Sequence, residues 1–376
     1  MKLGLALSGG GFRASLFHIG VLARMAELDI LGKVEVLSCV SGGSIVGAMY
    51  YLLLREMLQT KAKPSSQDFI EITQELEKRF VQGVQNNPRM HLLTNPLRNL
   101  QMALTEYSRT ERMASLLYRD FYGDVWTRQA QQSGQRLEPR IPLNSIKIQP
   151  PGYTPPLSVY NAHRTYKIPM LIINATTLNT GRNFRFTASE VGDPDLGYIR
   201  FDQSGNLLRL KQQLSPADTD WIRDMNGQDL YDRKQLALGT TQGLSAIQAV
   251  AQAKLDRRLA LLGVDRAVLR NRLRPYLPAG RNLSTDADLF SFLYEVRVAA
   301  QISDRFDRET VEHSLERAVA ASAAVPGIFE PIVFRTLYDD QAVEVVRLVD
   351  GGVYDNQGLT ALFEEACTHI ICSDAS

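Results

Sequence analysis

The sequence is poor in cysteine and histidine, and it contains no long hydrophobic run. Among its 376 residues are 3 cysteines and 5 histidines, and the cysteines form no CxxC pair of the kind that marks zinc or redox sites. Unpaired cysteines suit a reduced, cytoplasmic interior better than a disulfide scaffold. The longest apolar stretch, residues 45–54, is about half the length of a membrane span. We therefore expect no transmembrane segment, and any contact with a membrane should be peripheral.

An excess of charge of either sign is also missing. The 42 Lys and Arg residues nearly balance the 41 Asp and Glu residues, which gives a formal net charge of +1. No global basic field favours nucleic acid as a partner. No metal-ligand cluster stands out, so we expect no cofactor, and calcium is not implied. One segment, residues 250–276, is rich in arginine and could be a helix that lies on anionic lipid or a solvated, salt-bridged helix.

What the sequence does contain is an alternation of short buried runs and amphipathic segments. Such alternation predicts an α/β fold with a mostly parallel sheet and helices on its faces. No linker separates two halves, so we expect a single domain over residues 1–376 with helical or irregular insertions at about 60–160 and 195–300. The predicted strands are 3–7, 34–40, 169–175, 343–349 and 369–372, and the predicted helices of the core are 12–28, 45–58 and 361–366.

A glycine-rich loop, SGGGFRAS at residues 8–15, joins the first strand to the first helix. The spacing does not fit a phosphate-binding P-loop. It does fit the dinucleotide pattern GxGxxG/A. That motif, however, requires an acidic residue at the end of the second strand, and Glu35 lies at the beginning of that strand. A third possibility is an oxyanion hole, in which the N–H groups of Gly10 and Gly11 face a developing negative charge. A tight turn without a ligand remains an alternative.

The second strand runs into CVSGGS, which resembles the nucleophile elbow GxSxG. Around Ser41 the first glycine of the pattern is replaced by Cys39, whereas Gly43 matches the second. Around Ser44 the second glycine is replaced by Val46. Ser41 follows the strand directly, and cysteine is a smaller intrusion than a β-branched valine. Ser41 is therefore the predicted nucleophile, and we expect Ser44 to cap the helix that follows.

A serine nucleophile needs a base, and none of the histidines carries a motif. His18 lies one helical turn beyond the glycine loop, where a packing role is expected, and His369 opens the last strand. Asp350 is different, because DGG at residues 350–352 places a carboxylate at the end of a strand. An aspartate at that point could hydrogen-bond the serine directly and form a dyad without histidine, although DGG alone is an ordinary turn signal.

These three motifs, in this order, resemble the patatin-like phospholipase family. PMLIINATTLNTGR (residues 169–182) and ASAAVPGIFEPI (residues 321–332) resemble it as well. The resemblance implies a three-layer α/β/α fold, Ser41 as the nucleophile and Asp350 as the general base. It further implies an oxyanion loop of Gly9, Gly10 and Gly11, with Arg13 as a loop support or phosphate contact.

The resemblance implies a lipid acyl hydrolase that acts on a lipid or membrane-surface substrate through an acyl-enzyme intermediate. Two alternatives stay open: a catalytically weak or regulatory protein of the same fold, and a nucleotide-binding protein that uses GGGFRA. We expect the insertions to form a lid, a regulatory surface or an oligomer contact, which leaves a homo-oligomer open.

Overall fold

The fold was obtained as a computed structural model, which describes residues 2–61, 63–86, 108–133, 140–202, 204–225, 227, 230, 265–302, 314–335, 337–338 and 345–376. The chain divides into two compact units. The first unit comprises residues 1–191, 311–334 and 346–376, and the second comprises residues 192–310 and 335–345. The second unit overlaps the predicted insertion at about 195–300.

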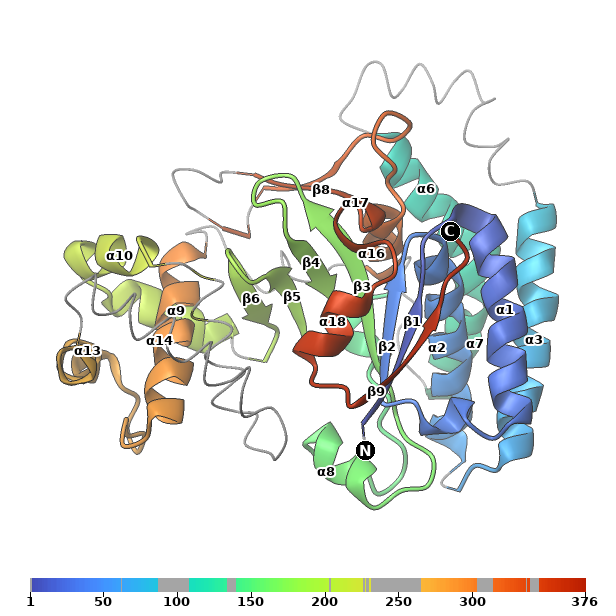
Figure 1. The fold of residues 1–376 in the computed structure, drawn as a ribbon, viewed down its shortest axis with the longest axis horizontal. Coiled ribbons are helices and arrows are strands. Elements are labelled where there is room, and N and C mark those ends of the chain that lie inside the picture. The colour runs from blue at the N-terminus through green and yellow to red at the C-terminus, as the bar shows by residue number, and fades with distance from the viewer. Residues whose placement is uncertain are drawn as a thin grey trace. The chain divides into compact units, whose positions relative to one another are not determined.

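The first unit contains a mostly parallel β-sheet (Figure 1). Its parallel strands lie in the order β3-β2-β1-β9, with bounds β1 Leu3–Leu7, β2 Val36–Val40, β3 Met170–Thr177 and β9 His369–Ser373. Antiparallel strands flank this set: β4 (Asn183–Phe186) and β8 (Val346–Asp350) both pair with β3, and β7 (Ile332–Phe334) pairs with β8. The predicted α/β class is confirmed, and each predicted strand matches an observed strand to within three residues at either end.

Helices cover both faces of this sheet. Since successive strand residues point to opposite sides, each strand contributes side chains to the contacts on both faces. On one face, the side chains of Leu7 and Cys39 point toward α2 (Gly42–Thr60), next to Gly47. On the other face, Ala6 packs against Leu362 of α18 (Leu359–Glu364). The result is the three-layer α/β/α fold that the sequence predicts.

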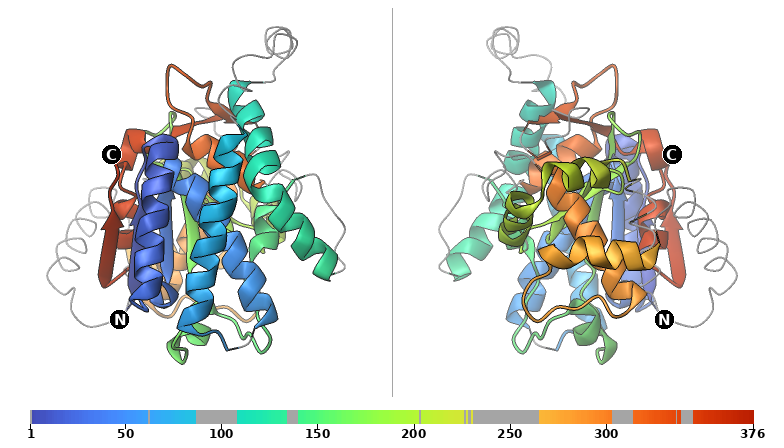
Figure 2. Two further views of the ribbon diagram at one scale, coloured as in Figure 1. Left: turned by 90° about the vertical axis from the view of Figure 1, so that its right-hand side faces the viewer. Right: turned by 90° about the vertical axis from the view of Figure 1, so that its left-hand side faces the viewer.

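The remaining helices of the first unit complete these layers. Figure 2 shows α1 (Gly11–Glu27) and α3 (Ser66–Gln85) side by side. The others are η1 Leu31–Lys33, α6 Arg109–Leu117, the π-helical turn η2 Tyr118–Tyr122, α7 Gly123–Ser133, η3 Leu143–Ile146, α8 Leu157–Ala162, α16 Leu315–Ser322 and α17 Gly352–Asp355. None of the helices in the described ranges is long and apolar enough to cross a bilayer.

The second unit is largely helical in its described residues. β5 (Glu190–Asp193) carries the chain into it, and β6 (Gly197–Arg200) follows. Its helices are α9 Ser204–Gln213, α10 Pro216–Arg223, α13 Arg266–Leu273, η4 Arg274–Tyr276 and α14 Asp286–Gln301. The arginine-rich segment predicted at 250–276 coincides with α13 and η4 from residue 265 onward, and its first part lies outside the described residues.

Candidate active site

Strand β3 brings two strand ends together. Val40, the last residue of β2, is paired with Asn174 of β3, and Asp350, the last residue of β8, is paired with the next residue, Ala175. β2 runs parallel to β3 and β8 runs antiparallel to it, so the two carboxyl ends approach each other along one strand. Ser41 follows β2 directly. The residue predicted as nucleophile and the residue predicted as base therefore lie side by side.

Ser41 has the backbone conformation of a nucleophile elbow. Its φ and ψ angles are 49° and −115°, a region that non-glycine residues rarely occupy and that stores strain. The turn is held in place because the Ser41 N–H donates to Ser322 Oγ (2.9 Å) and the Ser41 carbonyl accepts from Ser44 N–H (2.9 Å). Ser41 is also the N-cap of α2. Our expectation that Ser44 is the cap is wrong, because Ser44 lies inside the helix and bonds to Ser322 Oγ instead.

Two glycines after Ser41 let α2 approach the glycine loop. A Cβ atom on Gly42 would lie 2.1 Å from the carbonyl oxygen of Gly11, and one on Gly43 would lie 2.3 Å from the carbonyl oxygen of Leu7. Backbone atoms cannot move aside as a flexible side chain can, so the close packing of strand, loop and helix requires glycine at both positions.

Cys39, which replaces the first glycine of the elbow pattern, is fully buried against α2. A Cβ atom on Gly47 of that helix would lie only 2.3 Å from Cys39 Sγ. The strand thus carries a side chain where the elbow pattern has glycine, and the helix that faces it carries a glycine instead. Burial raises the pKa of the Cys39 thiol far above its usual value, so the sulfur acts as a packing group.

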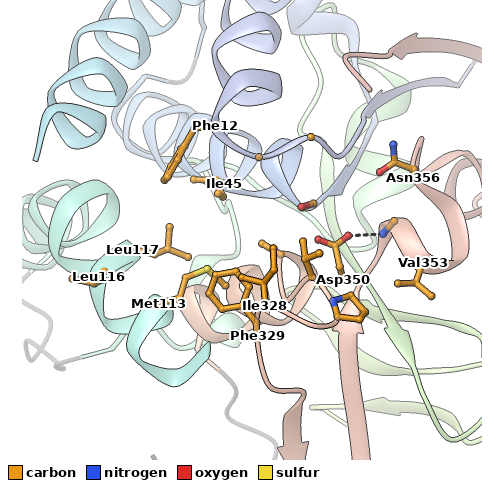
Figure 3. Close-up of a pocket in the computed structure, with 17 residues that line it drawn as sticks. Phe12, Ile45, Met113, Leu116, Leu117, Ile328, Phe329, Asp350, Val353 and Asn356 are labelled. Atoms are coloured by element: carbon orange, nitrogen blue, oxygen red, sulfur yellow. Dashed lines mark hydrogen bonds between the residues drawn. The ribbon is translucent and has the colours of Figure 1, made fainter. Parts of the chain in front are cut away.

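Asp350 is 6% exposed and is held by hydrogen bonds to both its backbone and its side chain. Its N–H donates to Ala324 O (2.9 Å), its carbonyl accepts from Thr176 Oγ1 (2.9 Å), and its Oδ1 accepts from the N–H of Gly352 (2.7 Å; Figure 3). Oδ2 meets no partner with full hydrogen-bond geometry in the described part of the chain. Burial raises the pKa of this carboxyl above its usual value, and the nearby Ser41 hydroxyl and Gly352 N–H partly oppose that rise.

Ser322 connects the two candidate catalytic residues, and sequence reasoning did not single it out. This fully buried hydroxyl accepts from the Ser41 N–H and donates to Asn174 O (2.5 Å), while the Ser322 carbonyl accepts from the N–H of Gly351 (3.1 Å). One residue thus fixes the turn at the serine and the turn after the aspartate. It lies in the stretch at residues 321–332 that resembles the patatin-like family, which was the available signal.

The glycine loop lies beside Ser41, but its three glycines are not equivalent. The Gly9 N–H already donates to Asn356 O (2.9 Å), so it is not available to a substrate. The N–H groups of Gly10 and Gly11 meet no acceptor among the described residues, because they precede and begin α1. Both glycines have positive φ angles, 132° and 64°. Of the three glycines, Gly10 and Gly11 are thus the ones whose N–H groups are left without an acceptor in the described part of the chain.

His18 supports this loop from behind. It is fully buried, with Nε2 3.0 Å from Ser8 O and Nδ1 2.7 Å from Ser373 Oγ. Because a carbonyl only accepts, Nε2 carries the proton and Nδ1 accepts from the serine hydroxyl. Burial lowers the pKa of His18. The expected packing role is thus what the structure shows, and His369 is an exposed residue at the start of β9, as expected.

A cavity of about 680 Å³ opens beside Ser41 and Asp350. Its other described lining residues are mainly apolar: Gly10, Gly11, Phe12, Ile45, Met113, Leu116, Leu117, Ala323, Val325, Pro326, Ile328, Phe329, Gly352, Val353 and Asn356. Asp350 is the only ionisable side chain within that set. Arg13 is exposed and lies outside it. Across the described ranges, no group of three His, Cys, Asp or Glu side chains could hold a metal ion.

The fold and this geometry define a class: an α/β protein with a strained serine at a strand-to-helix turn, an aspartate beside it and an apolar cavity in front. The chain belongs to the patatin-like phospholipase family, whose model matches residues 5–363. A comparison with curated proteins finds no match. Membership in this family indicates a lipid acyl hydrolase.

Proposed function

We propose that this protein hydrolyses carboxylic esters of lipids through a Ser41–Asp350 dyad. The observation that carries the proposal is the meeting of two strand ends along β3, where a strained serine lies beside a buried carboxylate and both line an apolar cavity. A single domain over residues 1–376, with insertions at about 60–160 and 195–300, is part of the same proposal.

In the proposed mechanism, Asp350 takes the proton of Ser41 as the serine oxygen attacks the ester carbonyl. Hydrogen-bond donation from Gly352 to Oδ1 orients the carboxylate and leaves Oδ2 for the serine. The N–H groups of Gly10 and Gly11 stabilise the tetrahedral oxyanion, a contribution of about 10²–10³ in rate per donor in comparable sites. Gly9 does not donate to the oxyanion in this mechanism, because its N–H is already bonded to the carbonyl of Asn356. The intermediate then collapses: the bond to the alcohol oxygen breaks, Asp350 gives its proton to the leaving alcohol, and the acyl-enzyme remains. Water attacks the acyl-enzyme with Asp350 again as the base, and the proton returns to Ser41 as the carboxylic acid leaves.

Burial of Asp350 has a chemical consequence. A carboxylate with an ordinary pKa of about 3.9 is a weak base near neutral pH. Removal from water raises the pKa of Asp350, which makes its ionised form a stronger base while the Ser41 hydroxyl stays within reach. The dyad therefore works without histidine only in a dry, oriented site.

The proposal is tested by labelling with a fluorophosphonate probe and by hydrolysis of a short p-nitrophenyl ester. Ser41→Ala should abolish labelling, and Asp350→Asn should lower both labelling and turnover by at least about a hundredfold. Ser44→Ala is the matched control, since Ser44 is three residues away, is buried and shares Ser322 as a partner. It should label at a rate close to that of the parent.

Retention of labelling in Ser41→Ala would refute the nucleophile, and undiminished turnover in Asp350→Asn would refute the base. A folded parent protein that neither labels nor turns over any ester would favour the regulatory alternative.

A further inference from the structure

One wall of the cavity comes from α6, a helix within the predicted insertion at about 60–160. Met113, Leu116 and Leu117 line the cavity. Their spacing of three and four residues places them on one face of the helix. Figure 3 shows them on the side of the cavity away from Asp350, with Val353 on the opposite side. The insertion therefore builds part of the candidate active site.

Helix α6 is attached firmly to the segment that forms the neighbouring wall. The Arg109 N–H donates to Glu330 Oε2 (3.0 Å), and the Thr110 hydroxyl donates to the carbonyl of Glu330. An ion pair joins Glu111 to Arg317 of α16 (2.7 Å). These contacts connect the first turn of α6 to residues on both sides of the stretch 323–329, which supplies Ile328 and Phe329 to the cavity.

An aromatic cluster lies behind the cavity wall near the start of α1. Phe12 lines the cavity and stacks on Phe121 with ring centroids 5.7 Å apart and an interplanar angle of 23°. Phe80 lies behind both rings, 5.0 Å from Phe121, and is fully buried. Because these rings are backed by the core, the wall at Phe12 cannot move aside without disturbing α3 and η2.

The chemistry of the cavity favours one kind of occupant. Apart from Asp350, its described lining carries no charged side chain, and the side away from Asp350 is aliphatic and aromatic. A headgroup or a phosphate would find no charge partner there, whereas a linear hydrocarbon chain would exchange water for apolar contact.

We propose that the α6 wall, formed by Met113, Leu116 and Leu117, binds the acyl chain of the substrate and sets the length of chain that is accepted. The ester carbonyl lies at Ser41, the chain extends toward α6 and Phe12, and the polar part of the substrate stays outside the cavity. This inference rests on the proposed ester hydrolysis, and it gives the insertion a role in selecting the substrate.

The test is a series of saturated p-nitrophenyl esters from butanoyl to hexadecanoyl. For the parent protein, kcat/KM should rise by up to about fourfold per buried methylene until the chain fills the cavity, and then level off. Leu117→Trp fills the far side of the cavity. It should lower kcat/KM for the best long ester by at least about tenfold more than it lowers kcat/KM for the butanoyl ester.

Ser115→Trp is the matched control, because Ser115 is on α6, is exposed and is not part of the cavity lining. The same added indole on the solvent face should leave the chain-length profile unchanged. Met113→Trp is a second blocking variant for the case that Leu117→Trp does not fold, since Met113 is less deeply buried.

The two proposals fail in different ways. If the parent neither labels with fluorophosphonate nor cleaves the butanoyl ester, the proposed function is wrong. If it does both, but the profile is flat or the folded blocking variants keep the parent profile, the assignment of α6 is wrong.

Discussion

Gly47 of α2 packs against Cys39 of β2. Replacing this glycine tests whether the close packing of the two residues is needed for the turn at Ser41 to form. In Gly47→Ala the new Cβ would lie 2.3 Å from Cys39 Sγ, well inside van der Waals contact. The sulfur has only one side-chain torsion and is fully buried, so either the strand or the helix must shift. The same Cβ would be 3.5 Å from both Cys39 Cβ and Leu7 Cδ1, which is ordinary contact. The sulfur atom alone makes the substitution a clash.

The magnitude follows from two opposing effects. Overpacking a tight core costs about 1–3 kcal/mol, and replacing glycine by alanine inside a helix gains about 1 kcal/mol. Gly47→Ala in the parent should therefore lower the free energy of unfolding by up to about 2 kcal/mol. In a Cys39→Ala background the clash is gone, and the same substitution should raise the free energy of unfolding by about 1 kcal/mol. The coupling between the two sites is then about 1–3 kcal/mol.

The assay is a double-mutant cycle by urea unfolding, with fluorophosphonate labelling of Ser41 as a second readout. Labelling should slow in Gly47→Ala, because α2 begins at the elbow, and should recover when Cys39→Ala is added. If Gly47→Ala changes the free energy of unfolding equally in both backgrounds, to within about 0.5 kcal/mol, the sulfur does not set the separation of strand and helix and the reasoning fails.

Other substitutions test the parts that position the dyad. Ser322→Ala leaves the buried N–H of Ser41 without its acceptor; unfolding by urea should show a loss of about 1–3 kcal/mol, together with slower labelling. The protonated form of Asp350 contributes stability that is lost as the pH rises through its raised pKa. Asp350→Asn should therefore have a higher melting temperature than the parent near neutral pH, and this difference should shrink as the pH falls. A difference in melting temperature that stays constant with pH would contradict the burial argument. Gly42→Ala forces a Cβ onto the Gly11 carbonyl and should lower stability by about 1–3 kcal/mol, whereas the exposed Gly20→Ala, with nothing nearby, should raise it by about 0.5–1 kcal/mol.

Local features of the sequence predict much of the core and of the candidate site. Buried apolar runs locate the strands, because a parallel strand covered on both faces must be apolar throughout. Turn chemistry locates Ser41 and Asp350 at strand ends, because glycines that permit close backbone approach follow each of them. These signals depend on residues next to each other in the chain, and they can be found without the fold.

The rest depends on contacts between distant segments. That β8 runs antiparallel to β3 and meets the end of β2 follows from pairing, which no local pattern encodes. The hydroxyl of Ser322 matters because it touches Ser41 and Asn174 at once, yet in the sequence it is one small residue in an alanine-rich stretch. The position of α6 beside the cavity depends on such contacts as well, because its apolar face looks like that of any amphipathic helix until the cavity is known.

Cys39 shows that the spatial requirement behind a motif can be met even where the sequence departs from the motif. The elbow pattern asks for glycine before the serine because strand and helix must come close. That requirement concerns the space between the two backbones, and a glycine on either the strand or the helix can provide this space. Here the strand carries a side chain and the helix carries Gly47, so the sulfur occupies the room that a Cβ on the helix would take. A search for GxSxG therefore misses this elbow, although the strained backbone of Ser41 is present. A pattern that allowed a small residue at 39 only together with glycine at 47 would describe the physical constraint better.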